Sequence, residues 1–172
     1  MDDAGKGVWA IEARAFRVWL TPFTHNFWLL RDAAGAVADQ LHGLAVDQRT
    51  GARKAIGGAA DRLTVVRDRE IAWALQPGQP AATAASGPAA ELAARWQAAV
   101  AAGGAINALG LPYPALWQHF SRVNCNSVFR TLGLAMGFAA PERLLATWAP
   151  GIGRPVSQAI VAQYGYRTPP TG

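Results

Sequence analysis

The single cysteine of the chain, Cys125, stands between two asparagines at the expected start of a helix. Asn124 is a typical N-cap residue, so Cys125 would lie in the first helical turn. Backbone N–H groups and the helix dipole favour the thiolate there, which is the form that attacks a carbonyl carbon. The same turn, with Asn126 and Ser127, would support the oxyanion that forms during acyl transfer. The alternative is a small buried cysteine that only packs; the polar neighbours favour a nucleophile.

A cysteine nucleophile needs a base, and the best-placed histidine is His25, which opens a predicted strand just after a proline break. It would take the thiol proton and later protonate the leaving group. His42 lies on the return strand. With a four-residue turn, Arg31 pairs with Ala36 and His25 lies opposite His42, with Cβ atoms about 4.5–5.5 Å apart. A slip of one residue would instead pair Asn26 with His42.

The third group of such a site orients the base and fixes its tautomer, and His42 is the first candidate for this role. Gln40 is a lesser candidate, and the alternative for His42 is a strand position that faces solvent. Gln40, Trp28 and His119 are candidate cleft residues; His119 lies on an aromatic stretch, where it packs or lines the cleft. The histidines offer no tight ligand pair on one helix, so we expect no metal site.

The elements that must position these residues come as a block of strands followed by a block of helices, which predicts an α+β fold. Strands are predicted at 9–20, 25–31, 37–46 and 62–67, with a further short one at 71–75. Loops are predicted at 47–61 and 76–87. Helices are predicted from Pro88 to Gly103, at 125–136 with Gly137 as the stop, from Pro141 through Trp148, and at 157–164. The expected architecture is a small antiparallel sheet packed against helices, with a glycine turn at 32–35 between the two histidine strands.

Length and composition favour one compact domain. The chain has 172 residues, of which 51% are hydrophobic and 16% charged, and seven are tryptophan. A chain of this size buries enough surface to fold without a disulfide or a structural metal. We expect one domain over 1–172, with its core at about 8–165 and a frayed tail at 166–172. A lone cysteine forms neither an internal disulfide nor a cysteine metal cluster, and no cofactor is expected.

The charge pattern narrows the classes of partner. The net charge is +5, but the arginines are scattered rather than gathered into one stripe, so we expect no nucleic-acid partner. Attraction to an anionic surface, such as a cell wall or lipid head groups, is compatible with this charge. No apolar run is long enough for a membrane-spanning helix, and the start is acidic, unlike a secretory signal. We therefore expect synthesis in the cytoplasm without a signal peptide, and export, if any, by a specialised secretion system.

These motifs together resemble a known family. A strand that opens with His25-Asn26-Phe27, a polar residue on the next strand, and a helix headed by Asn124-Cys125-Asn126-Ser127 are similar to circularly permuted NlpC/P60 proteins, which include the lecithin:retinol acyltransferase-like group. The histidine precedes the cysteine in these papain-like enzymes. The resemblance covers about residues 15–137 and departs from the family in the long Ala-rich segment before Cys125. It implies Cys125 as nucleophile, His25 as base and His42 as the third polar residue.

The resemblance extends to bacterial effector domains that are delivered to rival cells and cut peptidoglycan peptides. It implies a papain-like cysteine amidase or endopeptidase, with peptidoglycan or another amide or acyl compound as the substrate and an immunity or carrier protein as a partner. Two alternatives stay open. One is a lipid acyltransferase or thioesterase of the lecithin:retinol acyltransferase-like type, which the richness in tryptophan also suits. The other is a binding module that keeps the fold without turnover.

Overall fold

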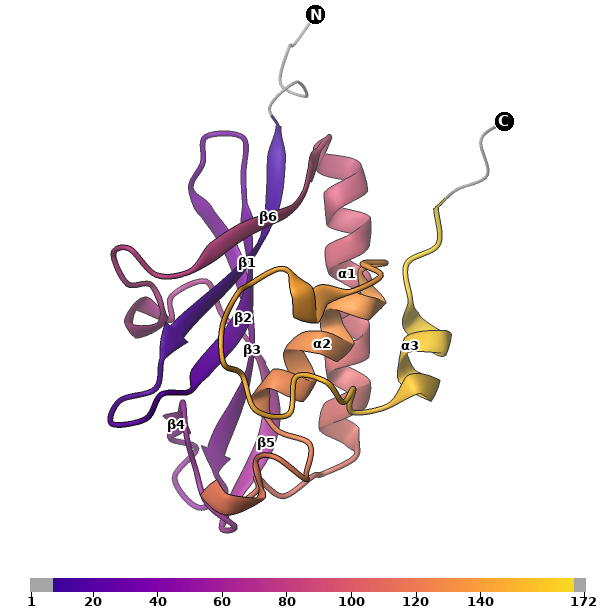
Figure 1. Cartoon of the computed structure of the whole chain (residues 1–172). Helices are drawn as coiled ribbons and strands as arrows, with labels where there is room; N and C mark the ends of the chain where they lie inside the picture. Colours follow the sequence, from indigo (N-terminus) through magenta and orange to yellow (C-terminus); the bar gives the residue numbers. More distant parts are fainter. Residues whose placement is uncertain (1–7, 169–172) are drawn as a thin grey trace, which may run out of the picture.

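The computed structural model describes residues 8–168, which form an α+β fold with an open antiparallel sheet and helices on one side of it (Figure 1). The strands in this range are β1 (Trp9–Arg17), β2 (Thr24–Arg31), β3 (Val37–Asp47), β4 (Arg53–Lys54), β5 (Asp61–Arg67) and β6 (Ala81–Gly87). The α-helices are α1 (Ala89–Ala108), α2 (Cys125–Ala135) and α3 (Gln158–Tyr164). Short 3-10 helices lie at η1 (Ala72–Ala74), η2 (Leu116–Gln118) and η3 (Pro141–Arg143). The predicted α+β class is confirmed.

Strands β2 and β3 pair with each other over only part of their length. The strand order is β4-β3-β2-β1-β6, and β5 also pairs with β3. β1 and β2 pair along almost their whole length, but β2 and β3 pair only as far as Trp28 and Leu41. Residues 24–27 of β2 and 42–44 of β3 therefore continue past each other without ladder hydrogen bonds between them. The start of α2 is hydrogen-bonded to the β2 side of this unpaired stretch, where Asn126 Oδ1 accepts the N–H of Asn26.

Alternation along the strands sends side chains to two separate cores. On the helix side, Trp28 and Leu41 pack in one cluster with Trp96 of α1 and Phe129 of α2. The cluster on the opposite side of the sheet contains Phe16, Phe27, Leu29, Leu44, Val66, Ile71 and Ala74. A residue of β2 next to Trp28 in sequence therefore belongs to the other face of the sheet.

Local signals in the sequence are confirmed where they depend on neighbouring residues alone. Gly35 has a φ of +78° in the predicted turn, a conformation that glycine adopts without strain. α2 ends one residue before the predicted Met136, and Gly137 follows with a φ of +87°. α3 begins after Ser157, whose hydroxyl accepts the N–H of Ile160 as an N-cap.

Several element predictions are wrong. Residues 76–87, predicted as a loop, contain β6, which pairs with β1 at the sheet edge. The loop predicted at 47–61 contains the short strand β4, and residues 71–75 form η1 rather than a strand. Helix α1 does not stop at Gly103: it runs on to Ala108, because the missing side chain of Gly103 lets it approach Val65 of β5, 2.8 Å from an ideal Cβ. The helix predicted from Pro141 is only the single turn η3.

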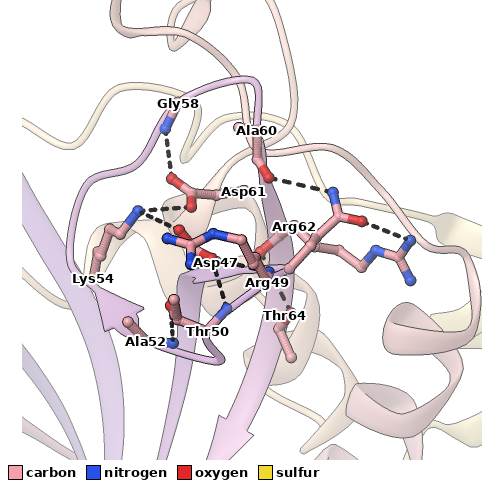
Figure 2. Close-up of polar contacts among 11 residues, drawn as sticks. Asp47, Arg49, Thr50, Ala52, Lys54, Gly58, Ala60, Asp61, Arg62 and Thr64 are labelled. Atoms are coloured by element: carbon pink, nitrogen blue, oxygen red, sulfur yellow. Dashed lines mark hydrogen bonds and ion pairs between the residues drawn. The ribbon is translucent and has the colours of Figure 1, made fainter.

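A polar cluster holds the far end of β3 against β4 and β5 (Figure 2). The Lys54 ammonium lies 2.8 Å from Asp61 Oδ1 and 3.6 Å from Asp47 Oδ2. Asp61 Oδ2 also accepts the N–H of Gly58 at 2.9 Å. The hydrogen bond from Lys54 and that from Gly58 hold the pKa of Asp61 below its usual value. These contacts fix the strand that carries His42.

No helix in the described part of the chain is both long and apolar enough to cross a bilayer. The acidic start on which the prediction about a signal peptide rests lies outside the described residues, as does most of the predicted frayed tail, at 169–172.

Candidate active site

The start of α2 has the predicted cap. Asn124 Oδ1 accepts the backbone N–H groups of Asn126 at 2.9 Å and Ser127 at 3.3 Å. The Ser127 hydroxyl in return accepts the N–H of Asn124 at 3.2 Å. This reciprocal capping box makes Cys125 the first residue of the helix, as the sequence predicts.

The side chain of Asn126 joins α2 to β2 on both sides of His25. Its Oδ1 accepts the N–H of Asn26 at 3.0 Å, and its Nδ2 donates to the carbonyl of Thr24 at 3.0 Å. Thr24 and Asn26 flank His25 in the chain, so one amide brackets the histidine. Asn126 directly follows Cys125 in the chain. Its two hydrogen bonds therefore fix the backbone next to Cys125 and the backbone on both sides of His25.

The three polar side chains predicted to assist the nucleophile form a chain of contacts. His25 Nε2 lies 3.3 Å from His42 Nδ1, and His42 Nε2 lies 3.0 Å from Gln40 Oε1. All three residues are fully buried. Burial lowers the pKa of His25 to about 3, and burial together with the nearby His25 charge holds the pKa of His42 well below its usual value. Both rings are therefore neutral at pH 7.

The hydrogen-bond network assigns the protons on the two rings. Gln40 Nε2 donates to the carbonyl of Arg69 at 3.0 Å, which turns Gln40 Oε1 toward His42. An amide oxygen only accepts, so neutral His42 carries its proton on Nε2 and accepts at Nδ1. His25 must then donate from Nε2. Its Nδ1 is left as a bare lone pair, and that atom is buried with no hydrogen-bond partner.

The contact between the histidines arises from a different strand register than the one predicted. Trp28 pairs with Leu41, and a register shift lies nearer the turn. Continuing this register places Phe27, not His25, opposite His42, and the two rings stack with centroids 4.3 Å apart. His25 reaches His42 diagonally, as residues two positions apart on neighbouring strands can. The predicted pairing is wrong, but the two imidazoles still meet.

Cys125 is a buried thiol rather than an exposed one. It is 4% exposed, and burial raises the pKa of its thiol to about 11. A hydrogen bond from the Tyr113 hydroxyl and the backbone N–H groups of Asn126 and Cys125 lower this pKa, but burial outweighs them. The predicted preference for the thiolate is therefore wrong for the resting protein. The N-terminus of α2 favours the thiolate, as expected, but the loss of solvation on burial raises the thiol pKa by more than the helix lowers it.

The cysteine and the histidines approach the sheet from opposite faces. An ideal Cβ on Gly43 would lie 3.0 Å from Cys125 Cα, so the first turn of α2 rests on the face to which Gly43 points. His42 is the next residue in the strand and projects to the other face. The His25 ring belongs to that other face too, stacked on Phe16 with centroids 4.9 Å apart. The structure therefore does not bring the predicted nucleophile and base together: His25 Nδ1 has no hydrogen-bond partner, Cys125 Sγ included.

The three candidate cleft residues, Gln40, Trp28 and His119, are all buried. Trp28 is fully buried in the helix-side core, where it stacks on Phe129 and donates its indole N–H to the Phe129 carbonyl at 2.8 Å. His119 is 5% exposed and packs against Tyr113, with ring centroids 5.5 Å apart. Burial lowers its pKa, opposed by a backbone hydrogen bond at Pro114. Tyr113, which touches the thiol, is a site residue that the sequence analysis missed; a tyrosine between two prolines gives no signal for it.

Within residues 8–168, no group of three His, Cys, Asp or Glu side chains is arranged to hold a metal ion. Comparisons of the chain with protein-family models, with curated proteins and with solved structures found no match. Function is therefore inferred from residue chemistry and geometry.

Proposed function

We propose that the protein is a thiol-dependent hydrolase of amide bonds on a papain-like, permuted NlpC/P60 fold, with Cys125 as nucleophile and His25 as base. The observation that supports it most is the bare, buried Nδ1 of His25. A buried nitrogen without a partner is uncommon and needs an explanation, and a catalytic proton acceptor is one. His42 and Gln40 fix the tautomer that leaves this atom free.

The proposed reaction has two steps. The Sγ–H proton of Cys125 passes to His25 Nδ1 while the sulfur attacks the carbonyl carbon of the substrate. The oxyanion is held by the Cys125 N–H, because the cap already uses those of the next two residues. The C–N bond then breaks, the imidazolium gives its proton to the departing amine, and a thioester remains. Water, deprotonated by His25, hydrolyses the thioester and restores the thiol.

Substrate binding has to start this sequence. The resting protein holds a protonated thiol and a neutral imidazole, because burial raises one pKa and lowers the other. A substrate that reaches both groups would bring a polar carbonyl and water to them. Such polar surroundings favour the thiolate–imidazolium pair, which the dry resting site disfavours. The sequence resemblance supports a peptidoglycan peptide as this substrate.

Three variants test the nucleophile and the base. Cys125→Ala and His25→Gln should each abolish release of peptides from purified peptidoglycan, measured by mass spectrometry. Asn107→Ala is the control, since it alters a polar side chain of α1 whose hydrogen bonds go to the backbone of Val65. It should keep activity. Urea unfolding of each variant separates lost chemistry from lost folding. An active Cys125→Ala protein would refute the mechanism.

A lipid acyl ester or amide is the second candidate substrate, favoured by an apolar cavity near the base. The cavity has a volume of about 480 Å³ and is lined in part by Phe16, Val18, Ile56 and Trp73. Phe16 is also the ring that stacks on His25. An acyl chain in this cavity would contact Phe16, whereas His25 itself is not among the lining residues. Incubation with phospholipid beside peptidoglycan distinguishes the substrates by the product that appears.

The third candidate is a binding module, favoured by the burial of both reactive groups. It predicts no turnover of either substrate by the wild-type protein. Binding of peptidoglycan fragments that is equal in the wild-type and Cys125→Ala proteins, without product, would select it over the hydrolase.

A further inference from the structure

Large apolar side chains are exposed at the end of the molecule where β1 turns into β2. Trp19, Leu20 and Trp117 have exposed fractions of 85%, 83% and 79%, and three further aromatic residues are about half exposed. We call these six residues the aromatic rim: Trp19, Leu20, Trp73, Trp117, Phe120 and Trp148. Isolated exposed apolar residues are ordinary on protein surfaces, but contiguous groups mark interaction sites.

Contacts between its segments show that the rim is contiguous. The Phe23 ring, next to the turn, packs on Phe120 and on Trp148, with centroids 5.5 and 4.9 Å apart. Trp19 and Trp73 line one cavity together with the residue that precedes Trp117. Segments that are far apart in sequence therefore bring their apolar side chains to one surface around the β1–β2 turn.

The turn that carries Trp19 and Leu20 is held in a strained form. Val18 donates its N–H to the Phe23 carbonyl at 2.9 Å, and both the N–H and the hydroxyl of Thr21 donate back to the Val18 carbonyl. Leu20 has a φ of 62°, and it is the one non-glycine residue with positive φ in the described chain. Leucine is strained there, where glycine would not be. The turn therefore has a leucine in a backbone conformation that costs stability, and the side chain of this leucine is exposed to solvent.

The chain segments that carry the aromatic rim are one-sided in charge. The rim segments are 15–24, 71–79, 113–126 and 144–158, and they contain no acidic residue. They do contain Arg17, Arg122 and Arg154, all exposed. Glu70, directly before one segment, lies 3.7 Å from Arg69. Tryptophan with arginine around a protruding apolar turn suits the boundary between lipid head groups and acyl chains, where the aromatic rings are preferred and cations meet phosphates.

We propose that the aromatic rim docks the protein on an anionic lipid bilayer, with Trp19 and Leu20 entering the head-group region and Arg17 and Arg122 facing lipid phosphates. A bilayer fits better than a second copy of the chain, because a second copy would bring the same arginines against one another. The docking needs no thiol chemistry, so it stands or falls separately from the proposed hydrolase.

Co-sedimentation with vesicles tests the docking, using the Cys125→Ala protein so that no lipid is turned over. It should bind phosphatidylcholine vesicles that contain phosphatidylglycerol, bind phosphatidylcholine alone more weakly, and release as salt is raised. Trp19→Ala and Leu20→Gly should each weaken the partition by about tenfold, the equivalent of about 1.4 kcal/mol. Val8→Ala is the control, since Val8 is 64% exposed just before the opposite end of β1; it should bind like the parent.

Leu20→Gly adds a second measurement, the melting temperature. It should change in opposite directions depending on whether Leu20 binds lipid or only stabilises the fold. Glycine relieves the positive φ, so the variant should melt at a higher temperature while it binds vesicles less well. Loss of binding together with a lower melting temperature would overturn the assignment. So would failure of the parent protein to bind anionic vesicles. A dimer that dissociates on Trp19→Ala would also overturn it, because the rim would then be buried against a second copy.

Discussion

Replacement of Asn126 by alanine is the sharpest test of how α2 holds the site together. The amide is 2% exposed and makes hydrogen bonds to the Asn26 N–H and to the carbonyls of Thr24 and Pro150, at 3.0, 3.0 and 3.1 Å. The Pro150 carbonyl keeps a second donor, Asn124 Nδ2, at 3.0 Å. The substitution therefore strands two buried backbone groups, at about 1–1.5 kcal/mol each. Alanine returns about 0.5 kcal/mol through its helix propensity. We expect a net loss of about 2 kcal/mol.

Urea unfolding followed by tryptophan fluorescence measures this loss, and Asn107→Ala is the matched control. The Asn107 amide also makes two backbone hydrogen bonds, to the N–H and carbonyl of Val65 at 2.6 and 2.9 Å, but it lies on α1. Asn107→Ala should lose less stability than Asn126→Ala, because Asn107 is exposed and Asn126 is buried. Only Asn126→Ala should lose hydrolysis, because only Asn126 brackets His25. A loss of stability below about 0.5 kcal/mol for Asn126→Ala would refute the reasoning. An equal effect of both variants on hydrolysis would also refute it.

Three further results are expected. Gly43→Ala should destabilise the protein by about 1–3 kcal/mol in urea unfolding, because its Cβ would lie 2.7 Å from a side-chain atom of α2. Gly104→Ala, which has open space around it, should be neutral or stabilising. Equal effects of the two substitutions would contradict the packing of α2 on Gly43. The free energy of unfolding should fall as the pH drops from about 6.5 toward 5, by roughly 2 kcal/mol for His25 alone. The reason is that His25 takes up a proton in the unfolded chain, whereas in the folded protein its pKa is about 3. A flat pH profile, or the same slope in His25→Gln, would count against a buried neutral ring. Without substrate, iodoacetamide should alkylate Cys125 slowly at pH 7, and the rate of alkylation should still be rising above pH 9. A rate that reaches its plateau below pH 8 would show that the thiol pKa is not raised.

Sequence reasoning succeeded where a feature depends on a few neighbouring residues. The Asn124 cap, the glycine turn at 32–35 and the start of α3 all follow from side chains that bond to their own backbone or from a glycine at positive φ. It failed for β6, because the small and breaker residues of 76–87 carry no strand signal and only pairing with β1 makes them extended. Gly103 was misjudged for the same reason, since the contact with β5 that requires a glycine is invisible in the local sequence.

The contacts of His42 with His25 and with Gln40 join residues that the sequence had singled out, whereas the role of Cys125 beside them stays a prediction. Cys125, His25 and His42 could be picked out because the chain has one cysteine and three histidines, and Gln40 because it lies two residues before His42 on the same strand. The strand register, the faces of the sheet and the raised thiol pKa depend on tertiary burial. Tyr113, which touches the thiol, could be found only in three dimensions.

The central claim is that His25 is neutral and presents a bare Nδ1 as the proton acceptor. Its imidazole ¹⁵N and ¹H shifts, measured by NMR across pH 5–8, test this directly. We predict the tautomer protonated on Nε2, with Nδ1 unprotonated and unchanged through the whole range, and the same for His25 in the Cys125→Ala protein. A proton on Nδ1, or a ring that becomes cationic near pH 6, would contradict the account.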